Sequence, residues 1–416
     1  MKNAQNSDTI TDMQVQTLKG FRDFLPKEAR KRKYMMDTFK KVFESYGFEG
    51  METPVLEFDE ILTGKYGDEG DKLMYRFEDN GGRKVAMRYD QTVPLARFVA
   101  QYNNLLPTPF KRYQIQNVFR AENTQKGRYR EFIQCDIDTV GIDSANADAE
   151  IIATAASALK ALGFTKFKVL INDRSVFEGL SMDAIIVLDK LKKIGEDGVV
   201  EEMVVKGICT NAEEAKNLLQ SIIDTKPTER LQEIFEALEK MGLSKENFEF
   251  SPTLARGLDY YTGMIFEIEA EEYPVGSICG GGRYDKLIGM FAGRDIPAVG
   301  FAFGFDRTYE AMDALNLFPE EMTNATSKVL VSVFNKKLEK KSIEVSSQLR
   351  SNNINAEVYL SETKMEKQLK YADQKGIPYV IILGPEEVEK NVVTLKNLKD
   401  RTQQQLPLED VIKKLA

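Results

Sequence analysis

The densest group of side chains that could do chemistry lies between residues 120 and 138. Within eleven residues the chain places three arginines, a lysine and a glutamate: Arg120, Glu122, Lys126, Arg128 and Arg130. Carboxylates follow at Asp136 and Asp138. Guanidinium groups suit phosphate oxygens, whereas carboxylates suit an ammonium or a polarised N–H. The segment therefore predicts a site that binds an anionic group and a cationic group side by side.

Alternation along residues 131–141 indicates which side chains face this site. Successive side chains of a strand point to opposite faces, so one face holds the apolar residues Ile133, Cys135 and Ile137. The other face carries Phe132, Gln134, Asp136 and Asp138. Alternation alone leaves two interpretations open, a solvated sheet face and a binding site. The basic loop before the strand favours the binding site.

Three further segments combine glycines with reactive side chains. Residues 256–263 read Arg-Gly-Leu-Asp-Tyr-Tyr-Thr-Gly, and residues 280–285 read Gly-Gly-Gly-Arg-Tyr-Asp. Glycine runs let a ligand approach the backbone closely, although many turns also contain them. In residues 298–307 an apolar strand leads through Gly304 into a helix that begins near Arg307. Arg307 either pairs with Asp306 or a nearby Glu, or holds an anionic ligand.

The composition excludes several kinds of chemistry. The chain contains no histidine and only three cysteines, which are scattered. Ser-His-Asp hydrolysis, His-ligated zinc and histidine general bases are therefore excluded, and no metal site of Cys or His is expected. There is no GxxxxGK[ST] loop and no GxGxxG spacing. With a net charge of −8, a nucleic-acid site has to be a local basic patch.

Length and patterning predict two folded domains. The 416 residues are expected to comprise a disordered tail (1–17), a domain over 18–325 with a helical insertion at about 175–250, and a domain over 328–416. Strands are expected at 110–120, 131–141, 261–270, 277–279 and 298–303 in the first domain. The second alternates strands and helices, which predicts a small α/β domain with a largely parallel sheet. The apolar runs are too short to span a bilayer and the N-terminus lacks a signal sequence, so a cytoplasmic protein is expected.

Taken together, these segments resemble the class II aminoacyl-tRNA synthetases. Phe119-Arg120-Ala121-Glu122 with the loop to Phe132 resembles their motif 2, and Gly300–Arg307 resembles motif 3. The region from Gly47 to Val55 resembles motif 1, the dimer element. The resemblance implies an α+β catalytic core, an antiparallel sheet flanked by helices, in a homodimer.

Within this class, residues 256–261, 127–132, 281–285 and 18–23 resemble peptides of the histidyl-tRNA synthetases, in the same order along the chain. The likeness extends past residue 17 and includes a C-terminal α/β anticodon-binding domain. It implies ATP-dependent activation of L-histidine and its transfer to tRNA(His), with Mg²⁺ accompanying ATP. Asp90 and Asp138 stand where many bacterial members have Glu, and Ile133 stands where many have a polar residue, often His.

The resemblance also implies roles for individual residues. Arg120 and Arg256 would hold the α-phosphate, and Arg128 and Arg307 the β- and γ-phosphates or the adenine. Phe132 would stack on adenine, and Glu122 would accept a hydrogen bond from the adenine amino group. Histidine would be bound by the remaining residues: Asp90, Thr92 and Gln134 at the ammonium, Asp138 and Tyr261 at the imidazole, and Arg256, Tyr260 and Tyr284 lining the pocket. With no histidine in the chain, tRNA acylation would use a phosphate oxygen or Gln134.

Two alternatives share this fold. A non-catalytic paralogue serves as a regulatory subunit of ATP phosphoribosyltransferase in histidine biosynthesis, and it typically lacks the C-terminal domain. A class II synthetase for another amino acid is the second alternative, and the peptide at residues 256–261 argues against it.

Overall fold

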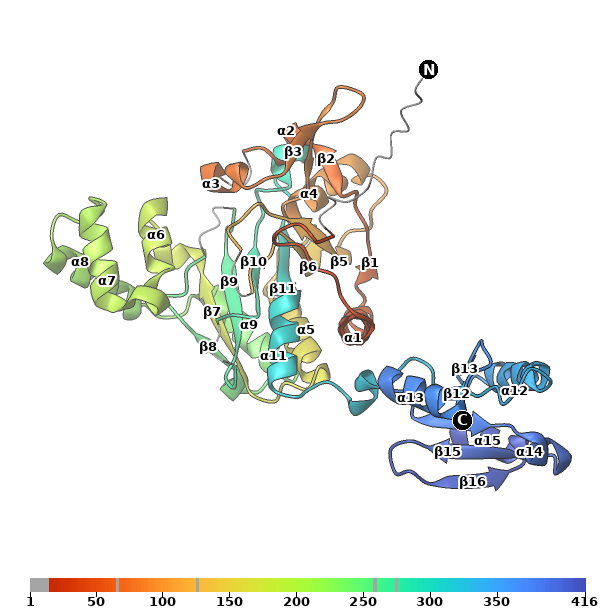
Figure 1. The fold of residues 1–416 in the computed structure, drawn as a ribbon. Helices are drawn as coiled ribbons and strands as arrows, with labels where there is room; N and C mark the ends of the chain where they lie inside the picture. The colour runs from red at the N-terminus through yellow and green to blue at the C-terminus, as the bar shows by residue number, and fades with distance from the viewer. Residues whose placement is uncertain (1–14, 65–66, 125–126, 257–259, 274–275) are drawn as a thin grey trace, which may run out of the picture. The chain divides into compact units, whose positions relative to one another are not determined.

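The computed structural model describes residues 15–64, 67–124, 127–256, 260–273 and 276–416 (Figure 1). The chain divides into two compact units. The first consists mainly of Met35–Leu317, and the second consists of Phe318–Ala416 together with Phe24–Tyr34. The expected tail lies largely in residues 1–14, outside the described residues.

An eight-stranded sheet forms the centre of the first unit. Its strands, in spatial order, are β1 (Glu49–Gly50), β5 (Phe110–Phe119), β6 (Glu131–Val140), β11 (Ala298–Gly304), β10 (Cys279–Arg283), β9 (Met264–Ala270), β7 (Phe167–Asp173) and β8 (Phe248–Phe250). All neighbours pair antiparallel except the two edge pairs, β1 with β5 and β7 with β8. The antiparallel core predicted for this domain is confirmed.

Helices pack against this sheet where its residues are apolar. Cys135 and Ile137 of β6 are fully buried, as their alternation predicts. Helix α1 (Pro26–Ser45) packs Phe39 against Phe303 of β11, with ring centroids 4.6 Å apart. Helices α5 (Ala145–Ala161) and α11 (Phe305–Ala314) pack against β6 and β11. Burying large aromatic and aliphatic side chains stabilises this layer. The polar side chains of the sheet lie outside it.

A small antiparallel sheet adjoins the start of helix α4 (Thr92–Tyr102). Its strands are β2 (Leu56–Phe58), β4 (Lys84–Met87) and β3 (Arg76–Glu78). A turn at Asn80-Gly81-Gly82 joins β3 to β4, with Gly82 at a positive φ of 76°. The short helices here are α2 (Asp59–Leu62) and α3 (Gly67–Lys72), and α10 (Gly289–Ala292) packs on α4.

Four helices follow one another between β7 and β8. They are α6 (Met182–Leu188), α7 (Leu191–Val205), α8 (Ala212–Ile223) and α9 (Glu229–Lys240). Figure 1 shows α6, α7 and α8 grouped beside the sheet, whereas α9 packs against α5. Three of them begin at side-chain caps, such as Asn211, which accepts from the backbone N–H of Glu214.

The second unit contains a five-stranded sheet in the order β13 (Ala356–Val358), β12 (Val329–Val331), β14 (Tyr379–Ile382), β15 (Val393–Asn397) and β16 (Gln403–Leu406). Its helices are α12 (Glu339–Ser351), α13 (Met365–Lys375), α14 (Pro385–Glu389) and α15 (Leu408–Leu415). The expectation of a largely parallel sheet is wrong, because two strand pairs are parallel and two are antiparallel. The polar, exposed sequence of β16 gave no strand signal.

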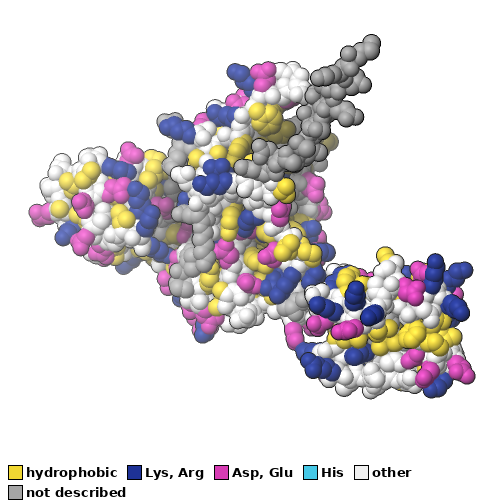
Figure 2. All heavy atoms as spheres, viewed as in Figure 1, with side chains coloured by type: hydrophobic (Ala, Val, Ile, Leu, Met, Phe, Trp, Pro, Cys, Tyr) yellow, Lys and Arg dark blue, Asp and Glu magenta, His cyan; other side chains and the backbone are white. Residues whose placement is uncertain are grey.

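The surface is mixed in charge. Figure 2 shows acidic and basic side chains interspersed over the visible face of each unit. In the part of the chain that the structure describes, no helix has the length and apolar character needed to cross a membrane.

Candidate active site

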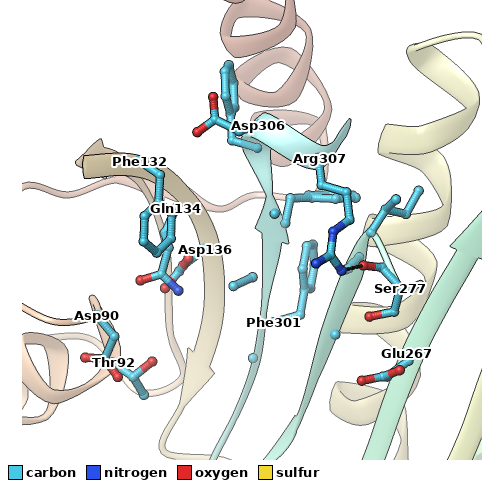
Figure 3. A pocket seen from close by; sticks show the side chains of 18 of the residues that line it. Asp90, Thr92, Phe132, Gln134, Asp136, Glu267, Ser277, Phe301, Asp306 and Arg307 are labelled. Carbon is cyan, nitrogen blue, oxygen red and sulfur yellow. Dashed lines mark hydrogen bonds between the residues drawn. The ribbon is translucent and has the colours of Figure 1, made fainter. Parts of the chain in front are cut away.

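A cavity of about 410 Å³ opens on the polar side of the main sheet (Figure 3). Its lining comes from the start of α4, the loop between β5 and β6, strands β6, β10 and β11, and the segment before β9. The lining includes every site residue predicted from the sequence: Asp90, Thr92, Arg120, Glu122, Arg128, Phe132, Gln134, Asp138, Arg256, Tyr260, Tyr261, Tyr284 and Arg307. Residues separated by more than 200 positions thus meet in one cavity.

Strands β6 and β11 form the floor of the cavity. Gln134, Asp136 and Asp138 of β6 pair in register with Gly304, Ala302 and Gly300 of β11. A β-carbon at Gly300 would fall 1.9 Å from Oδ1 of Asp138. The small residues of β11 therefore leave the space into which the polar side chains of β6 extend.

Asp138 is the centre of a buried polar group. Its Oδ2 lies 2.6 Å from Nη2 of Arg112, which is opposite it on β5, and its Oδ1 accepts a hydrogen bond from the Tyr284 hydroxyl. Burial raises the pKa of the Asp138 carboxyl, and the nearby Arg112 guanidinium opposes that rise. Burial also raises the pKa of the Tyr284 hydroxyl well above its usual value, which keeps it protonated and able to donate.

Arg256 is held at another wall of the cavity. Its Nη1 donates to Oε1 of Glu267 on β9 at 2.9 Å, and its guanidinium lies 5.6 Å from the ring centre of Tyr261. Burial opposes the charge, but Tyr261 and Glu267 outweigh it and hold the pKa of the guanidinium above its usual value. Gly280 gives Arg256 its space, because a β-carbon there would fall 2.1 Å from Nη1. Arg256 is therefore a fixed, permanent cation.

At one end of the cavity, a guanidinium at the start of the basic loop lies close to two aromatic rings. The guanidinium of Arg120 lies 4.3 Å from the ring centre of Tyr89 and 5.1 Å from that of Phe132, and its Nε donates to the Tyr89 carbonyl. Arg128 is more exposed and lies 3.8 Å from Glu122. Lys126, part of the same basic group in the sequence, lies outside the described residues.

Arg307 does not form the ion pair that one of its two interpretations expects. Asp306 pairs instead with Arg22, at 2.9 Å, and Arg307 donates from Nη1 to the Ser277 carbonyl. Within the described ranges Arg307 makes no ion pair. A charged guanidinium that lines the cavity and faces only a carbonyl remains available to an anionic ligand.

Asp90 and the tyrosines complete the lining. Asp90 accepts a hydrogen bond from the backbone N–H of Val93, which fixes the carboxylate at the first turn of α4 beside Thr92. Tyr260 and Tyr284 meet edge to face, with centroids 6.1 Å apart. Figure 3 shows Asp90, Thr92, Gln134 and Asp136 projecting toward the same side of the cavity.

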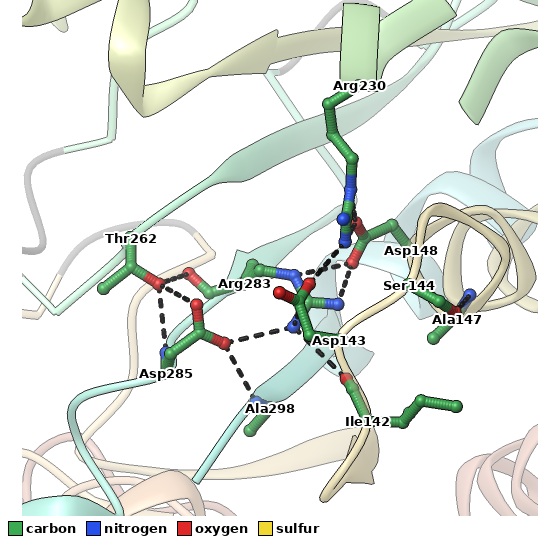
Figure 4. Close-up of polar contacts among 10 residues, drawn as sticks. All are labelled: Ile142, Asp143, Ser144, Ala147, Asp148, Arg230, Thr262, Arg283, Asp285 and Ala298. Atoms are coloured by element: carbon green, nitrogen blue, oxygen red, sulfur yellow. Dashed lines mark hydrogen bonds and ion pairs between the residues drawn. The ribbon is translucent and has the colours of Figure 1, made fainter. Parts of the chain in front are cut away.

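A buried ionic network fixes the segments that carry Tyr261 and Tyr284 (Figure 4). Arg283 on β10 donates to Asp148 of α5 and to Asp285, and Asp148 also accepts from Arg230 of α9. Oδ2 of Asp285 accepts from the Thr262 hydroxyl at 2.9 Å. Thr262 and Arg283 are the immediate neighbours of the two tyrosines, so the network sets where those phenols point.

Sequence reasoning missed several residues in or beside the cavity. Arg112, Glu267 and Tyr129 were not assigned to the site, because their roles depend on strand register and loop packing. The available signal for Glu267 was that two acidic residues, Glu267 and Glu269, interrupt the apolar residues of β9. The glycine run at 280–282 lies inside strand β10, where a β-carbon at Gly281 would fall 2.1 Å from the Gly300 carbonyl. Residues 257–259 lie outside the described residues.

The chain matches two family models. The histidyl-tRNA synthetase model matches residues 20–196 and 199–308, and the anticodon-binding domain model matches residues 328–416. The histidine–tRNA ligase of Cytophaga hutchinsonii is 40% identical, over 95% of this chain and 98% of the relative. That of Rhodopirellula baltica is 41% identical, over 94% and 95%.

Solved structures agree with these relatives. The crystal structure of histidyl-tRNA synthetase from Nostoc sp. PCC 7120 superposes with a TM-score of 0.84 at 30% identity, covering 97% of this chain and 99% of the other. The S. aureus histidyl-tRNA synthetase has the same fold, with a TM-score of 0.73 at 22% identity. The matches span both units and the segments that line the cavity, and the chain therefore belongs to the histidyl-tRNA synthetase family.

Proposed function

We propose that the chain activates L-histidine with ATP to form histidyl-adenylate, and then transfers the histidyl group to the 3′ end of tRNA(His). The observation that carries this proposal is the composition of the cavity. One part is lined by arginines and a stacking surface, and another by carboxylates and phenols. These are the groups needed to bring a nucleotide triphosphate and a small cationic amino acid together.

In the first step, an oxygen of the histidine carboxylate attacks the α-phosphorus of ATP, and pyrophosphate leaves. Arg120 and Arg256 are proposed to bind the α-phosphate oxygens, because positioned cations stabilise the charge that develops there. Arg128 and Arg307 bind the β- and γ-phosphates or flank the adenine. Phe132 stacks on the adenine, and this stacking extends the one it makes with Arg120.

Histidine is recognised at its two nitrogen-bearing ends. Asp90, Thr92 and Gln134 are proposed to hold the ammonium, whereas Asp138 and Tyr261 bind the imidazole. Tyr284 donates to Asp138 and thereby orients it. Buried polar groups of this kind discriminate strongly, because a substrate without matching N–H groups leaves them unpaired. Tyr260 closes the pocket against Tyr284.

The adenine and the transfer step complete the assignment. Glu122 is proposed to accept a hydrogen bond from the adenine amino group. In the second step, the terminal tRNA hydroxyl attacks the histidyl carbonyl and AMP leaves. Because the chain has no imidazole of its own, the proton of that hydroxyl passes to a phosphate oxygen or toward Gln134.

Mg²⁺ is proposed to arrive with ATP and not at a dedicated protein site. Among residues 15–64, 67–124, 127–256, 260–273 and 276–416, no three metal-ligating side chains cluster. The acidic lining residues Glu267 and Asp306 are already paired with Arg256 and Arg22. Mg²⁺ is commonly held by substrate phosphates and water, and the arginines here supply additional positive charge.

The other partners are proposed from the family to which the chain belongs. The C-terminal unit is expected to bind the anticodon stem of tRNA(His), and the segment at Gly47–Val55 to contribute to a homodimer. The site of action is the cytoplasm, where tRNA charging serves translation. A regulatory, non-catalytic role is disfavoured, because Arg120, Arg256 and Arg307 all line the cavity.

ATP–pyrophosphate exchange, measured with each amino acid in turn, tests the proposal. We expect exchange with L-histidine and background rates with the others. The absence of exchange with histidine would overturn the proposed activity. Exchange without charging of tRNA(His) would retain activation and remove the tRNA role.

A further inference from the structure

Asp136 is a buried carboxylate that the mechanism above does not use. It is 97% buried, on β6 between Gln134 and Asp138, and it lines the cavity. Its Oδ1 accepts no hydrogen bond from any described residue. Leaving a buried carboxylate without a partner is costly, so a site that retains one is built for a partner that comes from outside.

The residues opposite Asp136 on the neighbouring strands do not supply that partner. Gln114, opposite it on β5, uses its amide Nε2 to donate to Thr53 at 2.8 Å and to Gln116 at 2.6 Å. Ala302, opposite it on β11, offers only a methyl group. A ligand bound in the cavity can supply the missing donor.

The arginines near Asp136 are engaged elsewhere. Arg112 pairs with Asp138, and Arg88 donates to the carbonyls of Asn117 and Thr53 and to the Gln116 side chain. Arg120 donates to the Tyr89 carbonyl. None of these arginines donates a hydrogen bond to Oδ1 of Asp136, although the charges of Arg112 and Arg120 lower the pKa of its carboxyl.

A second unpaired acceptor lies beside it. Oε1 of Gln134 is also buried and accepts no hydrogen bond from the described residues, and Gln134 is two positions away on the same face of β6. Asp90 interacts electrostatically with Asp136 across the same cavity. Burial raises the pKa of the Asp136 carboxyl well above its usual value, and an incoming cation would offset that effect. Several acceptors around one space match a group with several N–H donors and a positive charge.

We propose that Asp136 binds the α-ammonium of the substrate histidine, together with Gln134. The inference rests on the proposed function and adds an anchor for the amino end of the substrate. Asp138, already held by Arg112 and Tyr284, serves the ring end. Asp136, two residues before Asp138, binds the ammonium. Two carboxylates on the same face of β6 therefore bind the two nitrogen-bearing ends of one molecule.

Equilibrium binding of three probes to Asp136→Asn separates this role from the alternatives. L-Histidine has both the ammonium and the ring, L-histidinol keeps both but lacks the carboxylate, and 3-(imidazol-4-yl)propanoate lacks the ammonium. We expect the variant to bind histidine and histidinol about 10- to 100-fold more weakly, the effect of losing a charged hydrogen bond. Its affinity for imidazolylpropanoate and for ATP should change less than twofold.

Controls make each outcome decisive. Glu131→Gln removes a charge from the same strand outside the cavity lining, and it should leave all four affinities unchanged. If the variant binds all three probes equally more weakly, Asp136 belongs to the ring and the proposal is wrong. Unchanged affinity for histidine, or an equal loss of affinity for ATP, would also overturn it. If the Asn variant does not fold, Asp136→Ser must give the same pattern. Failure of the wild type to bind histidine would refute the proposed function instead.

Discussion

Oδ2 of Asp138 lies 2.6 Å from Nη2 of Arg112, and the Arg112 side chain is fully buried. The two residues face each other across β5 and β6. Arg112 opposes the rise in pKa that burial causes at Asp138, which favours the ionised carboxylate, and Oδ1 of Asp138 accepts a hydrogen bond from Tyr284. An ionised carboxylate at this depth would otherwise be protonated or repelled from the interior.

Replacing Arg112 by Met should destabilise the protein by about 3 to 5 kcal/mol, because it leaves a buried carboxylate without its cation. Urea unfolding of the ligand-free protein measures the loss. The double variant Arg112→Met/Asp138→Asn should recover a large part of it, since no charge is then left unpaired. A single variant within about 1 kcal/mol of wild type would show that the pair does not stabilise the fold.

Gly300→Ala should lower both stability and histidine binding, because its β-carbon would clash with Asp138. Overpacking of this kind costs about 1 to 3 kcal/mol. Gly304→Ala on the same strand is the matched control for folding, since its β-carbon would have no neighbour nearer than 3.7 Å. Thermal unfolding of both variants, with histidine titration of the first, tests the contrast. Equal unfolding temperatures would contradict the steric argument.

Arg256→Ala should abolish activation while the protein stays folded. The expected fall in the exchange rate is at least about 100-fold, the effect of losing one positioned group that stabilises the transition state. Circular dichroism should be unchanged, because 23% of the Glu267 side chain is exposed and water can reach it once its partner is gone. Full exchange activity in the folded variant would mean that the α-phosphate lies elsewhere.

Asp136→Asn should stabilise the ligand-free protein, and the gain should depend on pH. Burial raises the pKa of Asp136 in the folded state, so stability falls as pH rises from about 4, where an unfolded Asp ionises, through the higher folded value. Asn cannot ionise and avoids this loss. The variant's advantage in urea unfolding should therefore be small at acid pH, grow as pH rises, and then level off. An advantage that does not vary with pH would contradict this account.

The sequence was informative where side-chain pattern and local spacing decide the structure. The two faces of β6 followed from alternation alone, because Cys135 and Ile137 are buried in the apolar layer and Gln134 and Asp138 line the cavity. These features depend on residues close together in the chain.

Other features depend on which strands become neighbours, and local patterns do not contain that information. Arg112 looked like an ordinary strand residue until its register with Asp138 was known. The crowding that requires glycine at 280–282 comes from β9 and β11, which the local sequence does not show. The roles of individual site residues in binding and catalysis remain predictions that the experiments above address.

The glycine–alanine row on β11 has a consequence for redesign. Gly300 and Gly304 already have the smallest side chain available, and Ala302 is one methyl larger. Substitution along this strand can therefore reduce the room above the sheet but can hardly increase it. Variants that accept a bulkier amino acid should arise at Tyr260, Tyr261 or Tyr284, because a smaller side chain there would enlarge the cavity. Variants that exclude a competing amino acid can arise from a single added methyl group on β11.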